Sequence, residues 1–422
     1  MYRVWTVIST YSLLLISGAL AALVWANLSP ESYHHFVETP LWTGGPFGVL
    51  ETHDGVTTRV LTLHFLVNDM LMALFFAIAA KEVWEAVILR EGSLRGKKAL
   101  TPLIATAGGM VGPVLVYLLI AAVSGVFNDI SHGWAVPTAT DIAFSYLVGR
   151  IVFGPGHPAI GFLLLLAIAD DAGGLIILAT FYPSAPLAPG WLALSFGAAV
   201  AVWLLCNWLP LRLDRNRPGR PCSSWVRRVL GAWPYALAGA LSWYGFQQAG
   251  IHPALGLLPI VPAIPHADRD FGVFAEGERY QTDLLNAMEH ALKLPVEWVL
   301  LLFGLMNAGV EFSAISAPTF AVLGGLLIGK PLGIFALGWL AAVGLRLGLP
   351  RGMGLRDLFV VGCVAAIGFT VALFVAAVAF EPGPHQDAAK MGALLSLACS
   401  VVAIATGRIL GIQKHDGTIK LS

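Results

Sequence analysis

Four ionisable side chains lie in segments that are otherwise almost entirely apolar. Asp170 and Asp171 are adjacent within the apolar run 161–179, which is long enough to cross a bilayer as a helix. A charged aspartate at the centre of a bilayer costs about 2.5–3.5 kcal/mol on insertion scales, and two neighbouring carboxylates also repel each other. Such a pair suits the binding of protons and cations. The alternative is a structural pair that a lysine or arginine elsewhere neutralises.

Asp141 lies at a predicted break in a membrane span. Pro137 removes a backbone donor and disfavours helix before it, and Thr138 and Thr140 can satisfy the carbonyls that this frees. An interrupted span with a carboxylate at the break presents backbone and side-chain oxygens to an ion. A proline kink with Asp141 as a helix N-cap is the alternative.

Lys330 is the fourth group, and glycines surround it. Gly325, Gly329 and Gly333 repeat at four-residue spacing on one helix face, so another helix can approach very closely. A buried lysine needs a carboxylate partner, whereas a lysine near the interface would extend its ammonium group to water. The phosphate-loop pattern GxxxxGK[ST] is absent at this position.

A second interruption is predicted at Ala366-Ile-Gly368-Phe-Thr370, in the middle of the span 354–380. Alone this signal is weak, because any span can contain a glycine. Together with the break at Pro137, it gives corresponding interruptions in the two halves of the chain, a pattern typical of a binding site near the bilayer midplane.

Composition places these residues in a membrane protein. Of 422 residues, 57% are hydrophobic and 12% are charged, about half the charged fraction of a soluble domain. The formal net charge of zero gives no indication of a nucleic-acid partner. Hydropathy predicts about twelve spans in a single transmembrane domain covering 1–422. They lie near 7–27, 60–86, 98–123, 133–150, 157–181, 190–211, 227–248, 250–265, 294–314, 318–345, 354–380 and 387–411.

The distribution of lysine and arginine predicts the orientation of these spans. Basic residues gather in alternate connections, such as 90–98 and 212–228, whereas 124–132 and 182–189 carry none. Because basic connections stay in the cytoplasm, both termini are expected there, including the tail 412–422.

Three other segments qualify this picture. The polar segment 30–59 is expected to be an external loop or hairpin. The connection 266–289 is acidic, although it falls on the predicted cytoplasmic side. The apolar N-terminus is long for a secretory signal, so we interpret 7–27 as the first span.

Several motifs occur together in the order seen in one transporter family. They are Asn68-Asp69, Gly108-Gly-Met110, Thr140-Asp-Ile-Ala-Phe144, Ala169-Asp-Asp-Ala-Gly173, Asn307-Ala-Gly-Val310, Gly329-Lys-Pro-Leu-Gly-Ile334 and Ile367-Gly-Phe-Thr370. With these motifs the chain resembles the NhaA family of bacterial sodium/proton antiporters over residues 5–411. The resemblance implies an all-α polytopic membrane protein of about 12 transmembrane helices, with inverted-topology repeats, two interrupted crossing helices and a small external β-hairpin.

The resemblance also implies a role for individual residues. Asp171 matches the carboxylate that binds the cation and gives up a proton, and Asp170 matches its partner, which pairs with the lysine at the position of Lys330. The polar residues at the crossing of the broken helices are Thr140, Asp141, Gly368 and Thr370. The positions linked to pH response are Glu82, His252, Glu289 and His290.

Three of these pH-response positions also have an ordinary structural interpretation. The two glutamates would otherwise be ordinary interfacial charges, and His252 an ordinary helix-end histidine. The family commonly has basic residues after the first glutamate, whereas this chain has Val83-Trp84-Glu85. The pH profile of this chain is therefore expected to differ from the family pattern.

The implied function is a secondary active antiporter and not an enzyme. It exchanges cytoplasmic Na+ or Li+ for external H+ in the bacterial inner membrane, under pH control, and so maintains internal pH and sodium. No cofactor is implied beyond the transported ions, with Na+ held at Asp171 and Asp170. The partners are the lipid bilayer and a second copy of the chain, bound through the hairpin at 40–58.

Other classes of protein also place two aspartates in a membrane. Intramembrane aspartyl proteases need a Gly-x-Gly-Asp context and membrane prenyltransferases need DxxxD-like clusters in loops, and neither pattern occurs around Asp170. A non-transporting sensor, a related symporter and an exchanger of other cations are the remaining alternatives.

Overall fold

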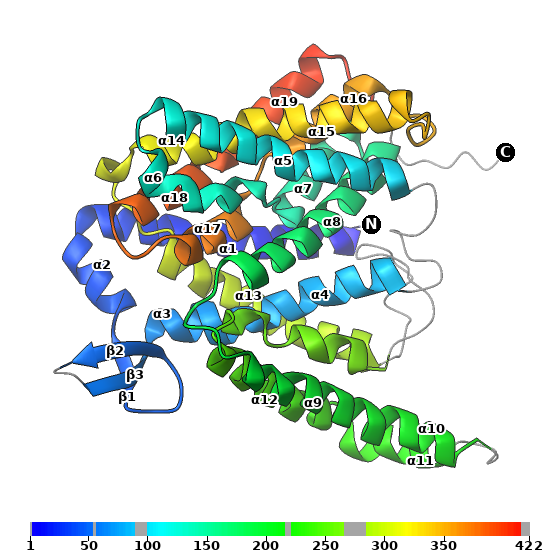
Figure 1. Ribbon diagram of the computed structural model, residues 1–422. Helices are drawn as coiled ribbons and strands as arrows, with labels where there is room; N and C mark the ends of the chain where they lie inside the picture. The colour runs from blue at the N-terminus through cyan, green and yellow to red at the C-terminus, as the bar shows by residue number, and fades with distance from the viewer. Residues whose placement is uncertain (1, 54–55, 89–98, 216–220, 266–283, 415–422) are drawn as a thin grey trace. The chain divides into compact units, whose positions relative to one another are not determined.

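The computed structural model describes residues 2–53, 56–88, 99–215, 221–265 and 284–414, with the backbone alone for 2–12. These residues are mostly helical, as the sequence predicts, with one small sheet (Figure 1). They form two compact units. Unit 1 comprises Met1–His34, Ser93–Ile177 and Gly304–Ser422, and unit 2 comprises His35–Gly92 and Leu178–Phe303. The basic connection at 90–98 and the acidic segment 266–283 lie outside the described residues.

Within the described residues, six helices are long and apolar enough to cross a membrane. They are Leu63–Ile88, Leu100–Val123, Pro158–Phe181, Pro189–Leu213, Ala317–Gly344 and Pro384–Ile409. A broken span, Leu355–Ala365 with Phe369–Ala379, is bent by 50° and makes a seventh. The shorter apolar helices Leu13–Leu28, Ile142–Phe153 and Pro253–Ala263 overlap three more of the expected spans. The total of about twelve stays a prediction.

Large apolar side chains cover the outer faces of these helices. Leu115 and Leu119 on one span are 63% and 61% exposed, and Val401 on another is 67% exposed. A contiguous apolar surface of this kind is unfavourable in water and suits contact with lipid.

Unit 1 is entirely helical in its described part. Its helices are α1 (Tyr2–Leu28), α5 (Leu100–Val123), α6 (Phe127–Ile130), the 3-10 helix η3 (Ser131–Thr138), α7 (Ile142–Phe153), η10 (Phe312–Ala314), α14 (Ala317–Gly324), the π-helix η11 (Gly325–Gly329), α15 (Lys330–Trp339), η12 (Leu340–Gly344), α16 (Leu355–Ala365), α17 (Phe369–Ala379), α18 (Pro384–Leu395), η13 (Ser396–Ala398) and α19 (Cys399–Ile409). Three further helices, α2 (Pro30–Val37), α8 (Pro158–Phe181) and α13 (Leu284–Asn307), have residues in both units.

The glycine face beside Lys330 makes the closest helix contact of this part of unit 1. A Cβ added at Gly329 would lie 2.7 Å from the carbonyl oxygen of Gly112 on α5, and a Cβ at Gly333 would overlap the carbonyl of Gly108. A Cβ at Gly325 would lie 2.8 Å from Pro137. The predicted stripe of small residues therefore packs α15 against α5 and brings the Pro137 break close to Lys330.

Unit 2 contains the sheet and a second group of helices. The helices are α3 (Leu63–Phe65), the π-helix η1 (Leu66–Leu71), α4 (Met72–Ile88), η4 (Pro189–Trp191), α9 (Leu192–Trp203), η5 (Leu204–Trp208), α10 (Leu209–Leu213), α11 (Pro221–Trp225), η6 (Val226–Leu230), α12 (Trp233–Ala249), η7 (Pro253–Leu255) and η8 (Leu258–Ala263). Their core includes Ala80, Tyr235 and Leu285.

The sheet lies at the expected position of the hairpin. Strands β2 (Val49–His53) and β3 (Val56–Thr62) pair antiparallel from Val49 opposite Val60 to His53 opposite Val56. A third strand, β1 (Pro40–Thr43), pairs with the other edge of β3, so the order is β1-β3-β2. The structure thus has the predicted hairpin, extended by one strand.

Asp214, which follows α10, caps the N-terminus of α11. Its carboxylate accepts hydrogen bonds from the backbone N–H groups of Cys222 at 3.0 Å and Ser223 at 2.7 Å. Desolvation acts to raise the pKa of this carboxyl, but the N–H groups of Ser223 and Cys222 outweigh it and lower that pKa to about 2.

Candidate functional site

The two interrupted helices of unit 1 cross at their breaks. Residues 139–141 are extended between η3 and α7, and residues 366–368 separate α16 from α17. Asp141 donates its backbone N–H to the carbonyl oxygen of Ile367 at 2.7 Å. A Cβ added at Gly368 would lie 2.9 Å from the carbonyl oxygen of Ala139, so the close approach of the two backbones depends on this glycine.

Threonine hydroxyls satisfy carbonyls that the breaks leave without helical partners. Thr138 donates to the carbonyl oxygen of Ala135 at 2.7 Å. The hydroxyl of Thr140 lies 3.1 Å from the carbonyl oxygen of Ala365, at the end of α16, which is the weaker acceptor of a proton that it shares with Asp170. This is the local chemistry expected from the Pro-Thr-Ala-Thr sequence. It allows non-helical backbone to exist at membrane depth.

Asp141 caps two helices at once. Its carboxylate accepts a hydrogen bond from the N–H of Phe144 in α7 at 3.1 Å, and another from the N–H of Thr370 in α17 at 3.2 Å. The hydroxyl of Thr370 donates to the same carboxylate. The N-capping alternative therefore describes part of its role, and one negative charge faces the positive ends of both half-helices.

Lys330 and Asp170 form a fully buried ion pair beside this crossing. The ammonium Nζ lies 2.7 Å from Oδ2 of Asp170, with side chains 0% and 1% exposed. Lys330 also donates to the carbonyl oxygen of Thr138, and the Thr140 hydroxyl donates to Oδ2 of Asp170 at 2.7 Å. Lys330 does not extend to the interface, so that alternative is wrong.

Asp170 and Asp171 differ in their surroundings. The second oxygen of Asp170, Oδ1, is buried without a hydrogen-bond partner among the described residues. Asp171 is half-buried, and its carboxylate experiences the negative charges of Asp170 and Asp141 and the positive charge of Lys330. The site therefore offers carboxylate oxygens that a hard cation can bind.

The expected pH-response residues lie in unit 2 and are only partly gathered. Glu82 and Glu289 both face Lys81, whose Nζ lies 3.8 Å from Oε1 of Glu82 and 2.7 Å from Oε2 of Glu289. Glu85 lies 2.9 Å from the same nitrogen. His290 on α13 is exposed and is not part of this cluster.

Sequence reasoning missed Lys81, the cation at the centre of that cluster. It is 2% exposed and links α4 to α13. The spacing Lys81-x-x-x-Glu85 is a helical i,i+4 pair and was the available signal. Glu82 is buried and Glu289 is half-buried against this lysine, so both glutamates have an ion-pair partner in addition to any interfacial position.

His252 also occupies a structural position. Its Nδ1 accepts a hydrogen bond from the N–H of Ala254 at 3.3 Å, at the start of η7. Its Nε2 lies 3.7 Å from Oδ1 of Asp69, which belongs to the π-helix η1. The helix-end alternative therefore describes its geometry, with a carboxylate as an additional neighbour.

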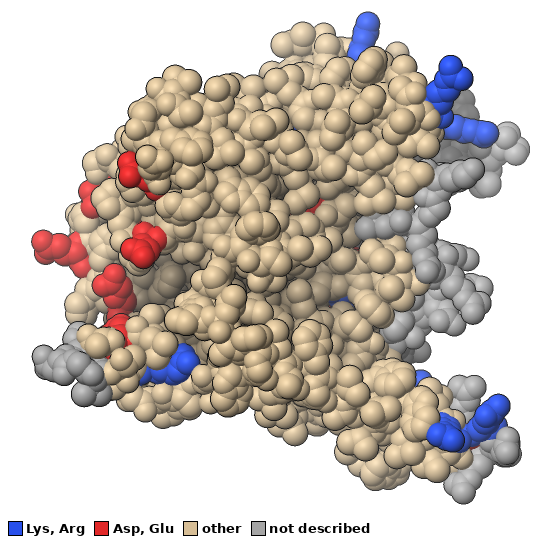
Figure 2. All heavy atoms as spheres, in the orientation of Figure 1, with Lys and Arg blue, Asp and Glu red and all other residues tan. Residues whose placement is uncertain are grey.

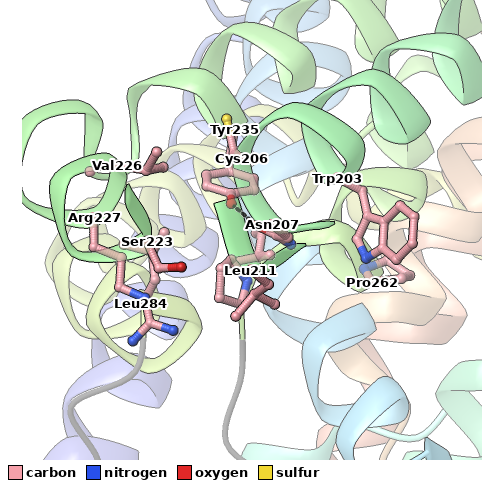
Figure 3. Close-up of a pocket in the computed structure, with 13 residues that line it drawn as sticks. Trp203, Cys206, Asn207, Leu211, Ser223, Val226, Arg227, Tyr235, Pro262 and Leu284 are labelled. Carbon is pink, nitrogen blue, oxygen red and sulfur yellow. Dashed lines mark hydrogen bonds between the residues drawn. The ribbon is translucent and has the colours of Figure 1, made fainter. Parts of the chain in front are cut away.

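A separate pocket of about 240 Å³ lies in unit 2 (Figure 3). Asn207 donates to the carbonyl oxygen of Ala263 at 2.6 Å on one wall, and the hydroxyl of Tyr235 contacts its amide oxygen. Arg227 is the charged residue of the lining. None of the residues predicted for ion exchange lines this pocket.

The family model and two similar relatives agree on one family. The chain matches the family model described as Na+/H+ antiporter 1 over residues 4–410. A protein described as Na(+)/H(+) antiporter NhaA from Jannaschia sp. (strain CCS1) is 66% identical over 421 residues, which are 99% of this chain and 100% of the relative. A protein of the same description from Desulfitobacterium hafniense (strain DSM 10664 / DCB-2) is 46% identical over 413 residues, covering 97% and 96%.

One solved structure, that of the sodium proton antiporter MjNhaP1 from Methanocaldococcus jannaschii, is 14% identical with a TM-score of 0.47, covering 96% of this chain and 99% of that one. The family match extends over nearly the whole length of the chain and of its relatives. The chain therefore belongs to the NhaA family of Na+/H+ antiporters.

Proposed function

We propose that this chain exchanges Na+ for H+ at the crossing of its broken helices, with both units acting as one transporter domain. The observation that carries the proposal is the buried Lys330–Asp170 ion pair beside the half-buried Asp171. Two carboxylates and one amine can hold protons there, and carboxylate oxygens are also ligands for a hard cation.

Coupling follows from competition for the same oxygens. Asp171 in its protonated form has no negative charge to offer a cation, so Na+ binds only when that proton has left. Oδ1 of Asp170, which has no partner among the described residues, and the hydroxyl of Thr140, which contacts Asp170, are the further ligands that we propose. Each ion is therefore carried only after the other has been released.

Lys330 determines whether a second proton moves. When Na+ approaches Asp170, it weakens the attraction between that carboxylate and the ammonium group. Lys330 can then release a proton as a neutral amine. Loss of one proton from Asp171 and one from Lys330 for each Na+ makes the exchange electrogenic.

The distribution of charged side chains along unit 1 supports an orientation with cytoplasmic termini. The broken span α16–α17 begins beside Arg351 and Arg356 and ends at Glu381. In Figure 2, red carboxylates lie over the region of α6 and α18, and blue basic side chains lie over the ends of α16 and α19. Since basic ends remain in the cytoplasm, Arg356 marks the cytoplasmic side in a bacterial inner membrane.

Regulation by pH is proposed to involve the Lys81 cluster in unit 2. Protonation of Glu289 would weaken the contact that links α4 to α13, and protonation of Glu85 would weaken the ion pair that Lys81 makes within α4. Such a link responds to pH because only the ionised carboxylates attract the ammonium group strongly. Control of this kind would adjust internal pH and sodium.

A homodimer is proposed to form through the sheet at 40–58. Strand β1 is exposed along its whole length, and both β1 and β2 are edge strands. Unpaired edge strands offer backbone donors and acceptors to a second copy. Cross-linking of single cysteines introduced in β1, in native membranes, tests this contact.

The exchange is tested in everted membrane vesicles by the pH response to added Na+, Li+ or K+. Wild type is expected to move protons with Na+ and Li+, and Asp171→Asn is expected to abolish this movement. Retained exchange in Asp171→Asn would overturn the assignment of the site. A response to K+ alone would favour an exchanger of other cations.

The role of Lys330 in proton movement is tested separately with Lys330→Ala. Loss or strong reduction of electrogenic exchange is expected, measured as a Na+-dependent membrane potential in proteoliposomes. Full electrogenic exchange in this variant would remove Lys330 from the proton pathway.

A further inference from the structure

A second buried lysine of unit 1 takes no part in the site described above. Lys390 lies on α18 within a membrane span and is 8% exposed. Its ammonium group makes no hydrogen bond or ion pair with the described part of the chain. A buried charge without a direct partner is costly, so packing alone is a poor reason for a lysine at this position.

The hairpin of α17 and α18 shows how deep Lys390 lies. The two helices are joined by residues 380–383 and pack against each other. Gln386 donates to the carbonyl oxygen of Ala377 at 3.0 Å, which aligns the two positions. At about 1.5 Å of rise per residue, Lys390 lies about 6 Å deeper than Gln386, and Thr370 about 10 Å deeper than Ala377. Lys390 is therefore about one helical turn from the level of the Asp141–Thr370 contact.

Asp387 lies one turn before Lys390, toward the end of the hairpin. Residues three apart share a helix face, and Asp387 is half-buried. Its carboxylate interacts electrostatically with Lys390 first, and then with His34 and Glu311. It thus stands between the buried lysine and the charged end of unit 1.

Titratable side chains are unevenly distributed around Asp387 and Lys390. The titratable groups near this end of unit 1 are Tyr33, His34, His132, Glu311, Glu381 and His385. The helices α14 and α17, which pack against α18, contain no titratable side chain. Asp387 therefore interacts with Lys390 on the inner side and with the charged end of unit 1 on the outer side, and Lys390 is the deepest of these groups along α18.

We propose that Asp387 and Lys390, the α18 pair, carry protons from the external water to the core carboxylates. The proposal rests on the exchange and orientation proposed above. An external proton binds the Asp387 carboxylate and then passes to the neutral amine of Lys390, which regenerates the carboxylate. The resulting ammonium gives the proton to a core carboxylate, directly or through water, and returns to the amine. One proton enters and no other bond changes.

A purely structural role for Lys390 makes a different prediction. A fixed positive charge that holds α18 in place would be replaced well by arginine, which keeps its charge. Arginine does not release its proton in proteins, so Lys390→Arg keeps the charge and removes the transfer. The arginine variant therefore separates the two roles.

The experiment measures Na+ efflux from proteoliposomes of uniform orientation, with internal Na+ and internal pH held constant and external pH varied. Wild type, Lys390→Met, Lys390→Arg and Asp387→Asn are compared. Lys414→Met is the matched control, because Lys414 is exposed and follows the last helix. Size-exclusion profiles of the purified proteins report whether each variant folds.

A relay predicts that all three α18 variants lose efflux at alkaline external pH by about a hundredfold, the lower end of the range for positioned proton transfer. At acidic external pH the loss shrinks, because protons in water are then abundant. The dependence on internal Na+ stays unchanged. Rescue by Lys390→Arg, or losses that do not vary with external pH, would overturn the proposal. Absence of exchange in wild type would instead overturn the proposed function.

If Lys390→Met does not fold, Asp387→Asn alone still decides the matter, because its half-buried side chain tolerates an amide of the same shape. Normal efflux in that variant at alkaline external pH would contradict the relay.

Discussion

Replacement of Lys330 by methionine should weaken the folded protein strongly, although it removes only one charge. Methionine fills a similar volume, but Asp170 then keeps the hydroxyl of Thr140 as its donor and loses the ammonium group at 2.7 Å. Removal of one partner from a buried ion pair costs about 3–5 kcal/mol, because an uncompensated charge remains. The hydrogen bond to the carbonyl of Thr138 is lost as well, at a net cost of about 1 kcal/mol.

A double variant measures the interaction between Lys330 and Asp170 separately from the effect of each substitution. Lys330→Met with Asp170→Asn removes both charges, so no unpaired ion remains at the crossing. The double variant is therefore expected to lose less stability than the sum of the two single losses. The difference, which is the coupling energy of the pair, should be about 2–3 kcal/mol. Asp170→Asn alone should also be destabilised, because it leaves the ammonium group of Lys330 without its carboxylate.

The assay is equilibrium or thermal unfolding of the purified proteins in one detergent, followed by tryptophan fluorescence. Wild type, both single variants, the double variant and the exposed control Lys414→Met are measured in parallel. If Lys330→Met unfolds like the control, or if the losses of the two single variants simply add, the reasoning about the buried pair is refuted.

Three other changes have expected outcomes. Gly333→Ala should lower stability by about 1–3 kcal/mol through overpacking, because the new Cβ overlaps α5, whereas Gly161→Ala, which has open space around it, should be neutral in the same unfolding assay. Lys81→Leu should shift the pH dependence of exchange, since buried carboxylates lose their cation; an unchanged pH profile in vesicles would remove this cluster from regulation. The cap by Asp214 should persist above about pH 4, the ordinary range of a free aspartate, and disappear as pH falls toward its lowered pKa of about 2. Backbone amide chemical shifts at the start of α11 would report this titration, and a midpoint near pH 4 would contradict it.

The pH range for Asp214 follows from the sign of its shift. A carboxyl whose pKa is lower in the folded protein binds protons less readily there than in the unfolded chain. Its contribution to stability is therefore complete above the unfolded pKa. It is lost as pH falls through the folded pKa.

Local chemistry made the crossing predictable. Pro137 ends regular helix, Thr138 and Thr140 satisfy nearby carbonyls, and Asp141 caps the helix that follows. The glycine spacing before and after Lys330 likewise predicted a close helix neighbour. These features act over a few residues, so they can be recognised without knowing the fold.

Other features depended on contacts between distant segments. The pairing of Lys330 with Asp170, 160 residues earlier, came from the family resemblance and not from spacing. Lys81 was missed because its closest partner, Glu289, is 208 residues away. The short helices η3, η7 and η8 replace regular spans where prolines and breaks interrupt the apolar pattern, which is why the count of spans was hard to predict.

The sequence alone therefore determined the membrane class, the two breaks and the residues that could bind protons or cations. Tertiary structure decided which of these residues meet. It joined Asp170 to Lys330 and Thr140, directed Asp141 to the ends of two helices, and buried Lys390 within α18. The physical reason is that apolar length and backbone capping are local properties, whereas the partner of a buried charge is set by how helices pack.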